Sequence, residues 1–324
     1  MVAKRISLEE YSNRLTTECN RVYDIVKTAK SRGHDPKLDI EIPQAIDLSE
    51  RTQKLLKFLH DRNTAAQIRE LTKVHDENRE LVALDIARIV CAESYLYGIK
   101  NTCPTCNGKG TIPRGRGFEI SCDDCGGSGY NLGYKQEVFQ DYKITLQAYE
   151  KHLANQTEQQ RDDVAAAMCI YQGICAGLAV LTEGILVAPL EGVVSCRIVS
   201  NADGTKCLGV NFAGPIRSAG GTGQALSVLI ADMLRRDFKL GVPQLTFGEV
   251  ERYKEEVSLY RGLQYRPSNP ELEIIAKSCP IFIDGEGVGK EVTGQRDLPR
   301  VRDNKVREGC LLVMCEGLVL KAPN

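Results

Sequence analysis

The segment 212–226 reads FAGPIRSAGGTGQAL, and its glycines separate two different hydrophobic patterns. Before it, alternating apolar residues in 193–198 and 207–212 predict two strands, joined by a turn at 201–204. After it, apolar residues recur at helical spacing from about 222 to 238. Because a strand enters the segment and a helix leaves it, the surrounding region is predicted to be mixed α/β.

The same glycine-rich loop, 213–224, brings backbone N–H groups together with polar side chains. Exposed amides at the start of a helix attract anions, and a guanidinium can bind a phosphate with two hydrogen bonds. The loop lacks the Gly-Lys-Ser/Thr of a Walker A motif and the dinucleotide fingerprint. We therefore predict contact with a nucleic-acid backbone, with a purely structural turn as the alternative; the residues concerned are Arg217, Ser218, Gly220, Gly221, Thr222, Gln224, Arg235 and Arg236.

Two CxxCxGxG units, at 103–110 and 122–129, form the second motif, with fifteen residues between the two cysteine pairs. Zinc takes four such ligands in a tetrahedron, and the glycines let amide N–H groups point at the sulfurs. We predict a closed, structural zinc site; iron–sulfur ligation is the less favoured alternative. The predicted metal ligands are Cys103, Cys106, Cys122 and Cys125.

Basic residues lie between the two cysteine pairs, beside Phe118. Lys109, Arg114 and Arg116 predict a small basic tip that contacts phosphate, or equally a loop that is merely solvated. The paired cysteines resemble half of the zinc domain of DnaJ-type chaperones. That resemblance covers about 30 residues and keeps open an independent zinc-bearing, chaperone-like or phosphate-binding protein.

Around these motifs the pattern predicts an α+β chain, helical in its N-terminal part. Ser7 and Glu10 form a capping box for an amphipathic first helix over about 7–31. Other predicted helices cover about 47–59, 64–90, 137–153, 159–181 and 247–263, and strand-like runs cover 272–276, 280–284 and 310–315. The predicted parts are 1–46, a helix and linker for subunit contact; 47–157, helical, with the zinc module at 100–130; and 158–324, the α/β domain.

The amino-acid composition limits the possible functions of the chain further. The chain has 324 residues, 42% of them hydrophobic, and a net charge of −1, so bulk electrostatic attraction to nucleic acid is excluded and any contact must be local. No signal segment or membrane span is expected, which favours a cytoplasmic location. Of thirteen cysteines, nine are scattered, and most of these are predicted to be small core residues rather than reactive thiols: Cys19, Cys91, Cys169, Cys175, Cys196, Cys207, Cys279, Cys310 and Cys315.

Two groups of carboxylates offer weaker candidates. Glu183 and Glu191 are expected to cap or turn the backbone rather than to act as a catalytic pair. A charged, glycine-rich loop is expected to be solvated rather than to bind a metal; its acidic residues are Asp284, Glu286, Glu291 and Asp297. No catalytic triad can be argued from the sequence.

Several segments resemble the N-terminal region of the large subunit of archaeal family-D DNA polymerases. They are 41–45, 181–192, 213–229, 263–265 and 313–317. The resemblance implies a two-subunit replicative polymerase in which the large subunit performs nucleotidyl transfer with magnesium and the small one is a 3′–5′ exonuclease. Its partners would be primer–template DNA and that small subunit.

The resemblance also implies what this chain lacks. The catalytic aspartates of the family lie beyond residue 324, so we expect the chain to be inactive alone and to bind no magnesium. The apolar end at 318–323 likewise favours continuation into a longer protein. The zinc module falls where the family has only a short connection, and it is therefore expected to be an insertion.

Overall fold

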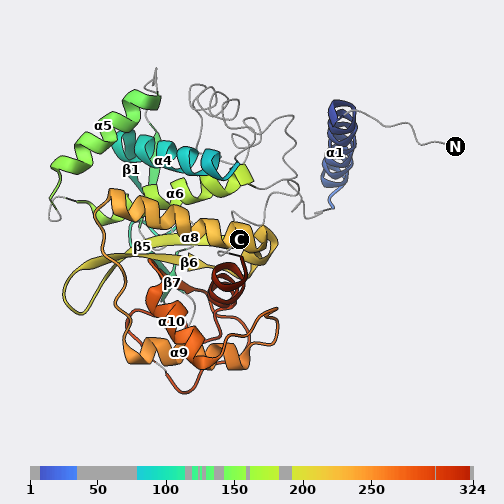
Figure 1. Cartoon of the computed structure of the whole chain (residues 1–324). Helices are drawn as coiled ribbons and strands as arrows, with labels where there is room; N and C mark the ends of the chain where they lie inside the picture. The colour runs from blue at the N-terminus through green and yellow to red at the C-terminus, as the bar shows by residue number, and fades with distance from the viewer. Residues whose placement is uncertain are drawn as a thin grey trace.

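The computed structural model describes residues 8–34, 79–113, 119–122, 125, 129–134, 142–157, 161–181, 192–295 and 297–321. The helix predicted over 47–59, and the part of the next helix before 79, lie outside these residues, as do Glu183 and Glu191. The rest forms a layer of helices stacked on a small sheet, with further helices beyond it (Figure 1).

The helical layer is built around α6 (Asp163–Leu181), with α4 (Arg79–Tyr97) and α5 (Tyr142–Asn155) beside it. Small residues let the helices approach, as the sequence predicts. A Cβ added at Gly173 would lie 2.7 Å from the Ala87 carbonyl oxygen. α6 is long and apolar enough to cross a bilayer, but 72% of its most apolar window is buried within the protein, as is usual for a core helix.

The sheet has three strands in the order β5–β6–β7. β5 (Val193–Ser200) and β6 (Lys206–Phe212) are antiparallel, and the predicted turn between them contains Gly204 at φ 84°. β7 (Phe282–Gly285) joins β6 in parallel. One face of the sheet packs toward α6 and α8 (Gly220–Asp237), which together enclose the main hydrophobic core.

Two segments predicted as strands are helical, and those predictions are wrong. Residues 272–276 lie in α10 (Asn269–Ser278), which begins with a capping box between Ser268 and Glu271. Residues 310–315 lie in α11 (Glu308–Leu311) and in the π-helix η4 (Leu312–Lys321). Because 309–317 are buried on every side, their apolar run carries no helical period.

Other predicted helices agree with the structure, including α9 (Phe247–Leu259) and the first helix, α1 (Leu8–Ser31). In Figure 1, α1 stands apart from the other described elements, with exposed apolar side chains at Val22 and Ile25. Residues of α4 and α6 belong to one hydrophobic core, so the domain boundary predicted at 157/158 separates helices that pack together. The division of the chain into the three parts given above stays a prediction.

Eight of the nine scattered cysteines are buried, as predicted. The side chain of the ninth, Cys19, is not among those that the structure describes. Burial raises the pKa of Cys91, Cys175, Cys279 and Cys315 to about 12. A thiol with so high a pKa carries almost no thiolate at neutral pH and is a poor nucleophile or ligand. These cysteines are core residues and contrast with the four in the paired motif.

Candidate functional site

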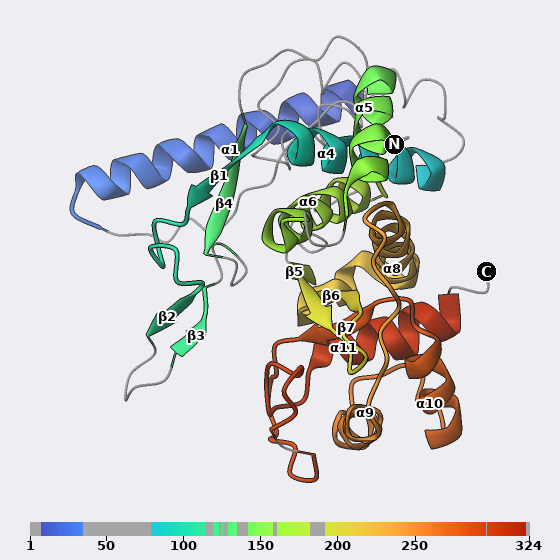
Figure 2. The same ribbon diagram turned by 90° about the vertical axis from the view of Figure 1, so that its left-hand side faces the viewer.

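The paired cysteines lie in an arm that projects from the body between α4 and α5 (Figure 2). Its stem is the antiparallel ribbon of β1 (Gly98–Thr102) and β4 (Tyr130–Tyr134). Its outer end is the short hairpin of β2 (Thr111–Pro113) and β3 (Glu119–Ser121). The cysteines sit between the two ribbons, where each pair closes a turn.

The four predicted ligands converge. Their sulfur atoms all lie within 4.8 Å of one another and are buried. The Sγ–Sγ distances are 3.9 Å for Cys103 and Cys122, and 3.6 Å for Cys106 and Cys125. A tetrahedron with metal–sulfur bonds of about 2.3 Å places its sulfurs roughly 3.8 Å apart. The group can therefore hold a metal ion of zinc-like size, with every coordination position taken by protein.

The glycines act as the spacing predicts. The amide of Gly110 donates to Cys106 Sγ at 3.3 Å, and the amide of Gly129 donates to Cys125 Sγ at 3.2 Å. Both glycines have positive φ, 75° and 80°. A Cβ at Gly129 would lie 2.4 Å from the Gly108 carbonyl oxygen, so the two turns pack backbone to backbone. Each turn thus directs an N–H dipole at the charge of its own thiolate.

The two turns are also related by matching backbone bonds. Cys103 N donates to Gly129 O at 2.9 Å, and Cys122 N donates to Gly110 O at 2.8 Å. Backbone amides of Cys106 and Thr105 lower the pKa of Cys103 to about 7, which favours the thiolate that a metal requires. Lys109 is exposed on this arm, whereas Arg114, Arg116 and Phe118 lie outside the described residues.

The glycine-rich segment forms a compact junction rather than an open loop. A 3₁₀ helix, η3 (Gly214–Ala219), leads directly into α8. Gly220, at φ 68°, makes the bend between the two helices, and its amide donates to Arg217 O. Gly220 and Thr222 are exposed and Gly221 is half-buried, so this N-terminus of α8 is open to solvent.

The first turn of α8 has no side-chain cap among the residues that the structure describes. Amides in the first turn of a helix have no carbonyl partner within the helix, and they carry the positive end of its dipole. Gly221 and Thr222 occupy these positions. The first turn of α8 therefore combines partly or fully exposed residues with the amide positions that bind anions at helix N-termini.

Arg217 lies beside this N-terminus with its side chain 43% exposed. Its Nη2 atom donates to Tyr260 Oη at 2.9 Å and to Gly262 O at 3.0 Å. The same atom lies 3.7 Å from the Glu308 carboxylate. Tyr260 in turn donates to Glu308 Oε1 at 2.5 Å. Burial, and then the hydrogen bond to Glu308, raise the pKa of Tyr260, so the phenol remains protonated and able to donate.

Tyr260, Gly262 and Glu308 were not singled out from the sequence. They lie 43 to 91 positions beyond Arg217, and only the tertiary fold brings them to it. Glu308 also closes the space beside Gly214, where an added Cβ would lie 2.7 Å from Glu308 Oε2.

The other predicted phosphate contacts fall in different places. Ser218 is exposed next to Arg217, while Gln224 is only 1% exposed in the core. Arg235 is buried, pairs with Asp232 at 2.6 Å and donates to Leu240 O. Arg236 also pairs with Asp232, but its side chain is 70% exposed at the far end of α8. Gln224 and Arg235 are thus inaccessible to a ligand in this arrangement.

The prediction of a solvated acidic loop at 284–297 is wrong for its first residue. Asp284 lies on β7, fully buried, and accepts hydrogen bonds from Arg197 and Arg307. Its carboxylate is therefore an internal counter-ion and not a surface charge. Glu286, Glu291 and Asp297 are exposed.

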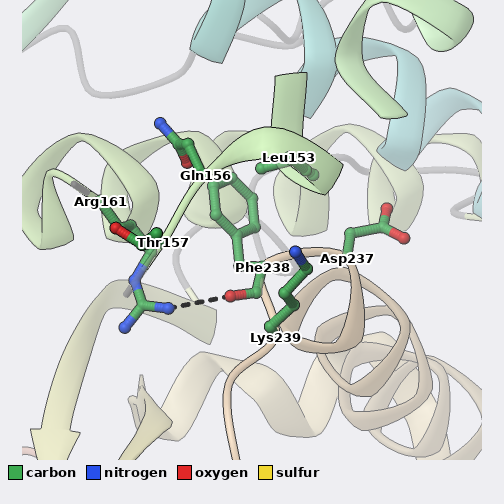
Figure 3. A pocket seen from close by; sticks show the side chains of 7 residues that line it. All are labelled: Leu153, Gln156, Thr157, Arg161, Asp237, Phe238 and Lys239. Carbon is green, nitrogen blue, oxygen red and sulfur yellow. Dashed lines mark hydrogen bonds between the residues drawn. The ribbon is translucent and has the colours of Figure 1, made fainter. Parts of the chain in front are cut away.

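A cavity of about 210 Å³ lies where α5, α6 and α8 end or begin (Figure 3). Two cationic side chains in its wall donate hydrogen bonds to carbonyl oxygens at helix C-termini. Arg161 Nη1 donates to Phe238 O at 2.9 Å, and Lys239 Nζ donates to Ala154 O at 3.2 Å. Cations that satisfy C-terminal carbonyls in this way stabilise helices. We read this cavity as part of the helix packing.

Comparison with known proteins places these features in a family. A family described as "DNA polymerase II large subunit DP2, N-terminal" matches residues 10–102 and 135–324. The gap in this match, 103–134, contains all four paired cysteines. The uncapped helix N-terminus and Arg217 fall inside the second matched range.

Similar proteins carry a matching name. A DNA polymerase II large subunit from Picrophilus torridus is 36% identical over 98% of this chain, and one from Thermoplasma volcanium is 35% identical over 99%. A DNA polymerase II large subunit from Methanococcoides burtonii is 34% identical over 98% of it. The chain spans only 23%, 23% and 22% of the length of these relatives. Since the family match covers most of its residues, the chain belongs to the family of N-terminal regions of the DNA polymerase II large subunit.

Proposed function

We propose that this chain is the N-terminal, non-catalytic portion of a replicative DNA polymerase large subunit, acting in the cytoplasm, and that it helps to hold DNA. The observation that carries the DNA contact is the exposed, uncapped N-terminus of α8 with Arg217 beside it. Family membership and the names of the relatives supply the polymerase context. The DNA is primer–template, the substrate of an enzyme of that name.

Local geometry must supply the attraction, because the net charge of the chain is −1. First-turn amides at Gly221 and Thr222 and the hydroxyl of Thr222 offer neutral donors, while Arg217 offers a charged one. A phosphate group accepts several such bonds at once, and it profits from the dipole of an 18-residue helix. Ser218 extends the donor set on the exposed side.

The position of Arg217 favours a strand of nucleic acid over a free nucleotide. Its guanidinium lies at the surface, 43% exposed, rather than in a deep pocket. The 14 residue steps from Thr222 to Arg236 span roughly 21 Å of helix, so the two ends of α8 would meet different phosphates. We propose Arg236, and the arm residues Lys109, Arg114 and Arg116, as secondary contacts, and we leave the buried Gln224 and Arg235 out.

For the arm we propose bound zinc with a structural role. Four buried thiolate ligands, with no nitrogen or oxygen ligand among the described residues, are the donor set of structural zinc. With no open coordination position, the metal would fold the arm rather than activate water. Cys103, Cys106, Cys122 and Cys125 would hold it.

The whole protein would perform template-directed nucleotidyl transfer with magnesium, using residues outside this chain. A small 3′–5′ exonuclease subunit would be its partner, as the resemblance implies. α1 supports a role in that assembly, because it exposes the apolar side chains of Val22, Tyr23 and Ile25 within about one turn.

The test is binding of the chain to a labelled primer–template, followed by fluorescence anisotropy over a range of salt concentrations. We expect Arg217→Ala to weaken binding roughly 10-fold and to reduce the salt slope by about one. Lys277→Ala, which removes an exposed positive charge from α10, is the matched control and should bind as the natural chain does.

Two outcomes would overturn the proposal. One is a folded chain that binds no DNA at low salt. The other is an Arg217→Ala variant indistinguishable from the Lys277→Ala control. Hydrolysis of a nucleotide, or capture of an unfolded client by the chain alone, would instead favour the independent zinc-bearing or phosphate-binding protein.

A further inference from the structure

The segment 260–266, which reads YRGLQYR, leads from α9 toward α10 and passes directly beside the glycine-rich junction. Arg217 Nη2 donates to Gly262 O at 3.0 Å and to Tyr260 Oη at 2.9 Å. Arg261 is the residue between these two acceptors. The guanidinium that we assign to phosphate is therefore bonded to the residues on both sides of Arg261.

The backbone around Arg261 is held in place. Before it, the carbonyl oxygen of Tyr260 accepts from Arg266, which also donates to Val257 O at 3.0 Å and so caps the C-terminal end of α9. After it, Gly262 lies so close to the ring of Tyr260 that an added Cβ would be 2.8 Å from Tyr260 Oη. A backbone fixed in this way loses little conformational entropy when a ligand binds.

The same segment is attached to the body at a further point. The amide of Gln264 donates to Glu316 Oε1 at 2.8 Å, and Glu316 is 7% exposed in η4. Since η4 packs against α8, this bond ties the segment to the helix whose N-terminus forms the proposed phosphate site.

The side chain of Arg261, in contrast, is exposed to solvent. Among the residues that the structure describes, its guanidinium makes no hydrogen bond and no ion pair. The exposed Arg266 differs, because its donors bind the backbone carbonyls at the end of α9. An arginine with its N–H donors unpaired, on a fixed backbone, can bind a phosphate through two charge-assisted hydrogen bonds.

The carboxylates that hydrogen bonds place beside this segment do not neutralise Arg261. Each accepts from another donor: Glu308 from Tyr260, Glu316 from Gln264, and Glu271 from Ser268 and Tyr265. None of them forms an ion pair with Arg261 within the described part of the chain. The positive charge of Arg261 thus remains available to a ligand at the surface.

We propose that Arg261 is a further DNA contact, which binds a second phosphate beside the one held by Arg217 and the N-terminus of α8. This inference rests on the proposed function, because it extends the same DNA surface from the junction to segment 260–266. Arg217 reaches Gly262, the residue next to Arg261, and consecutive Cα atoms are about 3.8 Å apart. The two arginines therefore serve the same stretch of nucleic-acid backbone.

The first test compares the binding of the natural chain, Arg261→Ala, Arg217→Ala and the double variant to labelled primer–template at several salt concentrations. We expect Arg261→Ala to weaken binding about 3- to 10-fold and to reduce the salt slope by about one, and the double variant to reduce the slope by about two. Arg32→Ala removes an exposed arginine just beyond α1 and is the matched control, which should bind as the natural chain does.

The outcomes separate this inference from the proposed function. If Arg261→Ala binds like Arg32→Ala while Arg217→Ala binds more weakly, the role of Arg261 is overturned and the DNA contact of the junction stands. If neither Arg261→Ala nor Arg217→Ala weakens binding, both are overturned.

Neutral methylphosphonate linkages, placed at one phosphate of the DNA at a time, locate the second contact. When the phosphate that Arg261 binds is neutral, Arg261→Ala should have no further effect, whereas Arg217→Ala should lose its effect at a different phosphate. If the two variants lost their effects at the same phosphate, or if Arg261→Ala kept its effect with every neutral linkage, a separate contact by Arg261 would be refuted.

Discussion

The metal arm and the glycine-rich junction use glycine in opposite ways. In the arm, Gly110 and Gly129 turn their amides inward, onto the sulfurs of Cys106 and Cys125. In the junction, the amides of Gly221 and Thr222 begin α8 and face an exposed edge. The arm carries its own anions, as thiolates, whereas the carboxylate beside the junction, Glu308, accepts a hydrogen bond from Tyr260. In the arm, backbone N–H groups that helices and strands leave unpaired donate to anions of the chain itself. In the junction, the corresponding N–H groups remain available to an external ligand.

Removing one thiolate should have the largest effect. Cys122→Ser should abolish metal binding and unfold the arm, because about 10–16 kcal/mol of folding energy of a structural zinc site comes from the metal. Mass spectrometry of the native chain should return one metal ion, and that of the variant none. The body should keep its own thermal transition, since the cysteine cluster packs separately from the main core.

Cys279→Ser is the control for that experiment, because Cys279 is a buried cysteine outside the arm. It should retain the metal. If Cys122→Ser still bound one metal ion per chain, the four-cysteine centre would be refuted.

A smaller effect is expected from Gly129→Ala, which would force a Cβ to 2.4 Å from the Gly108 carbonyl oxygen at a φ of 80°. Together the clash and the positive φ should cost about 1–3 kcal/mol. We expect metal affinity, measured by competition with a chelator, to fall roughly 10- to 100-fold. Gly204→Ala has a similar φ of 84° but open space around it, and it should leave metal affinity unchanged. Equal affinity in the two variants would show that the contact between the turns is unimportant.

The sequence located the arm more completely than the junction, for a physical reason. Metal ligands repeat at short, fixed spacings, so the Cys103–Cys125 set was readable without tertiary structure. For the junction, the sequence predicted only the order of the backbone elements, a strand followed by glycines and then a helix. The contacts of Arg217 with Tyr260 and Glu308 arise from elements far apart in the chain, and no local pattern announces them.

The same limit explains the misread elements. The apolar run 310–315 is buried all round, and a helix in that setting has no periodic face. Segment 272–276 was read as a strand although Ser268 and Glu271 three residues later signal a helix start. Arg235 and Arg236 are adjacent in sequence, but only their rotation about α8 buries the first and exposes the second.

The smallest expected effect concerns Glu308, whose carboxylate lies beside the junction, 3.7 Å from Arg217 Nη2. Glu308→Gln should strengthen DNA binding by up to about 5-fold, because it removes a charge that repels phosphate and holds Arg217; exposed pairs of this kind contribute about 0.2–1 kcal/mol. Anisotropy at low salt would measure the change. Glu273→Gln on α10 removes an equal charge elsewhere and should have no effect. Weaker binding by Glu308→Gln would mean that Glu308 presents Arg217 to DNA instead of restraining it.

The central claim is that the open donors of the junction meet a phosphate, and the amides themselves can report it. In ¹H–¹⁵N spectra of the chain titrated with primer–template, the amide resonances of Gly221 and Thr222 should shift and become protected from solvent exchange. Those of Gly110 and Gly129, already bonded to sulfur, should stay in place. DNA binding that leaves Gly221 and Thr222 unchanged would contradict the account.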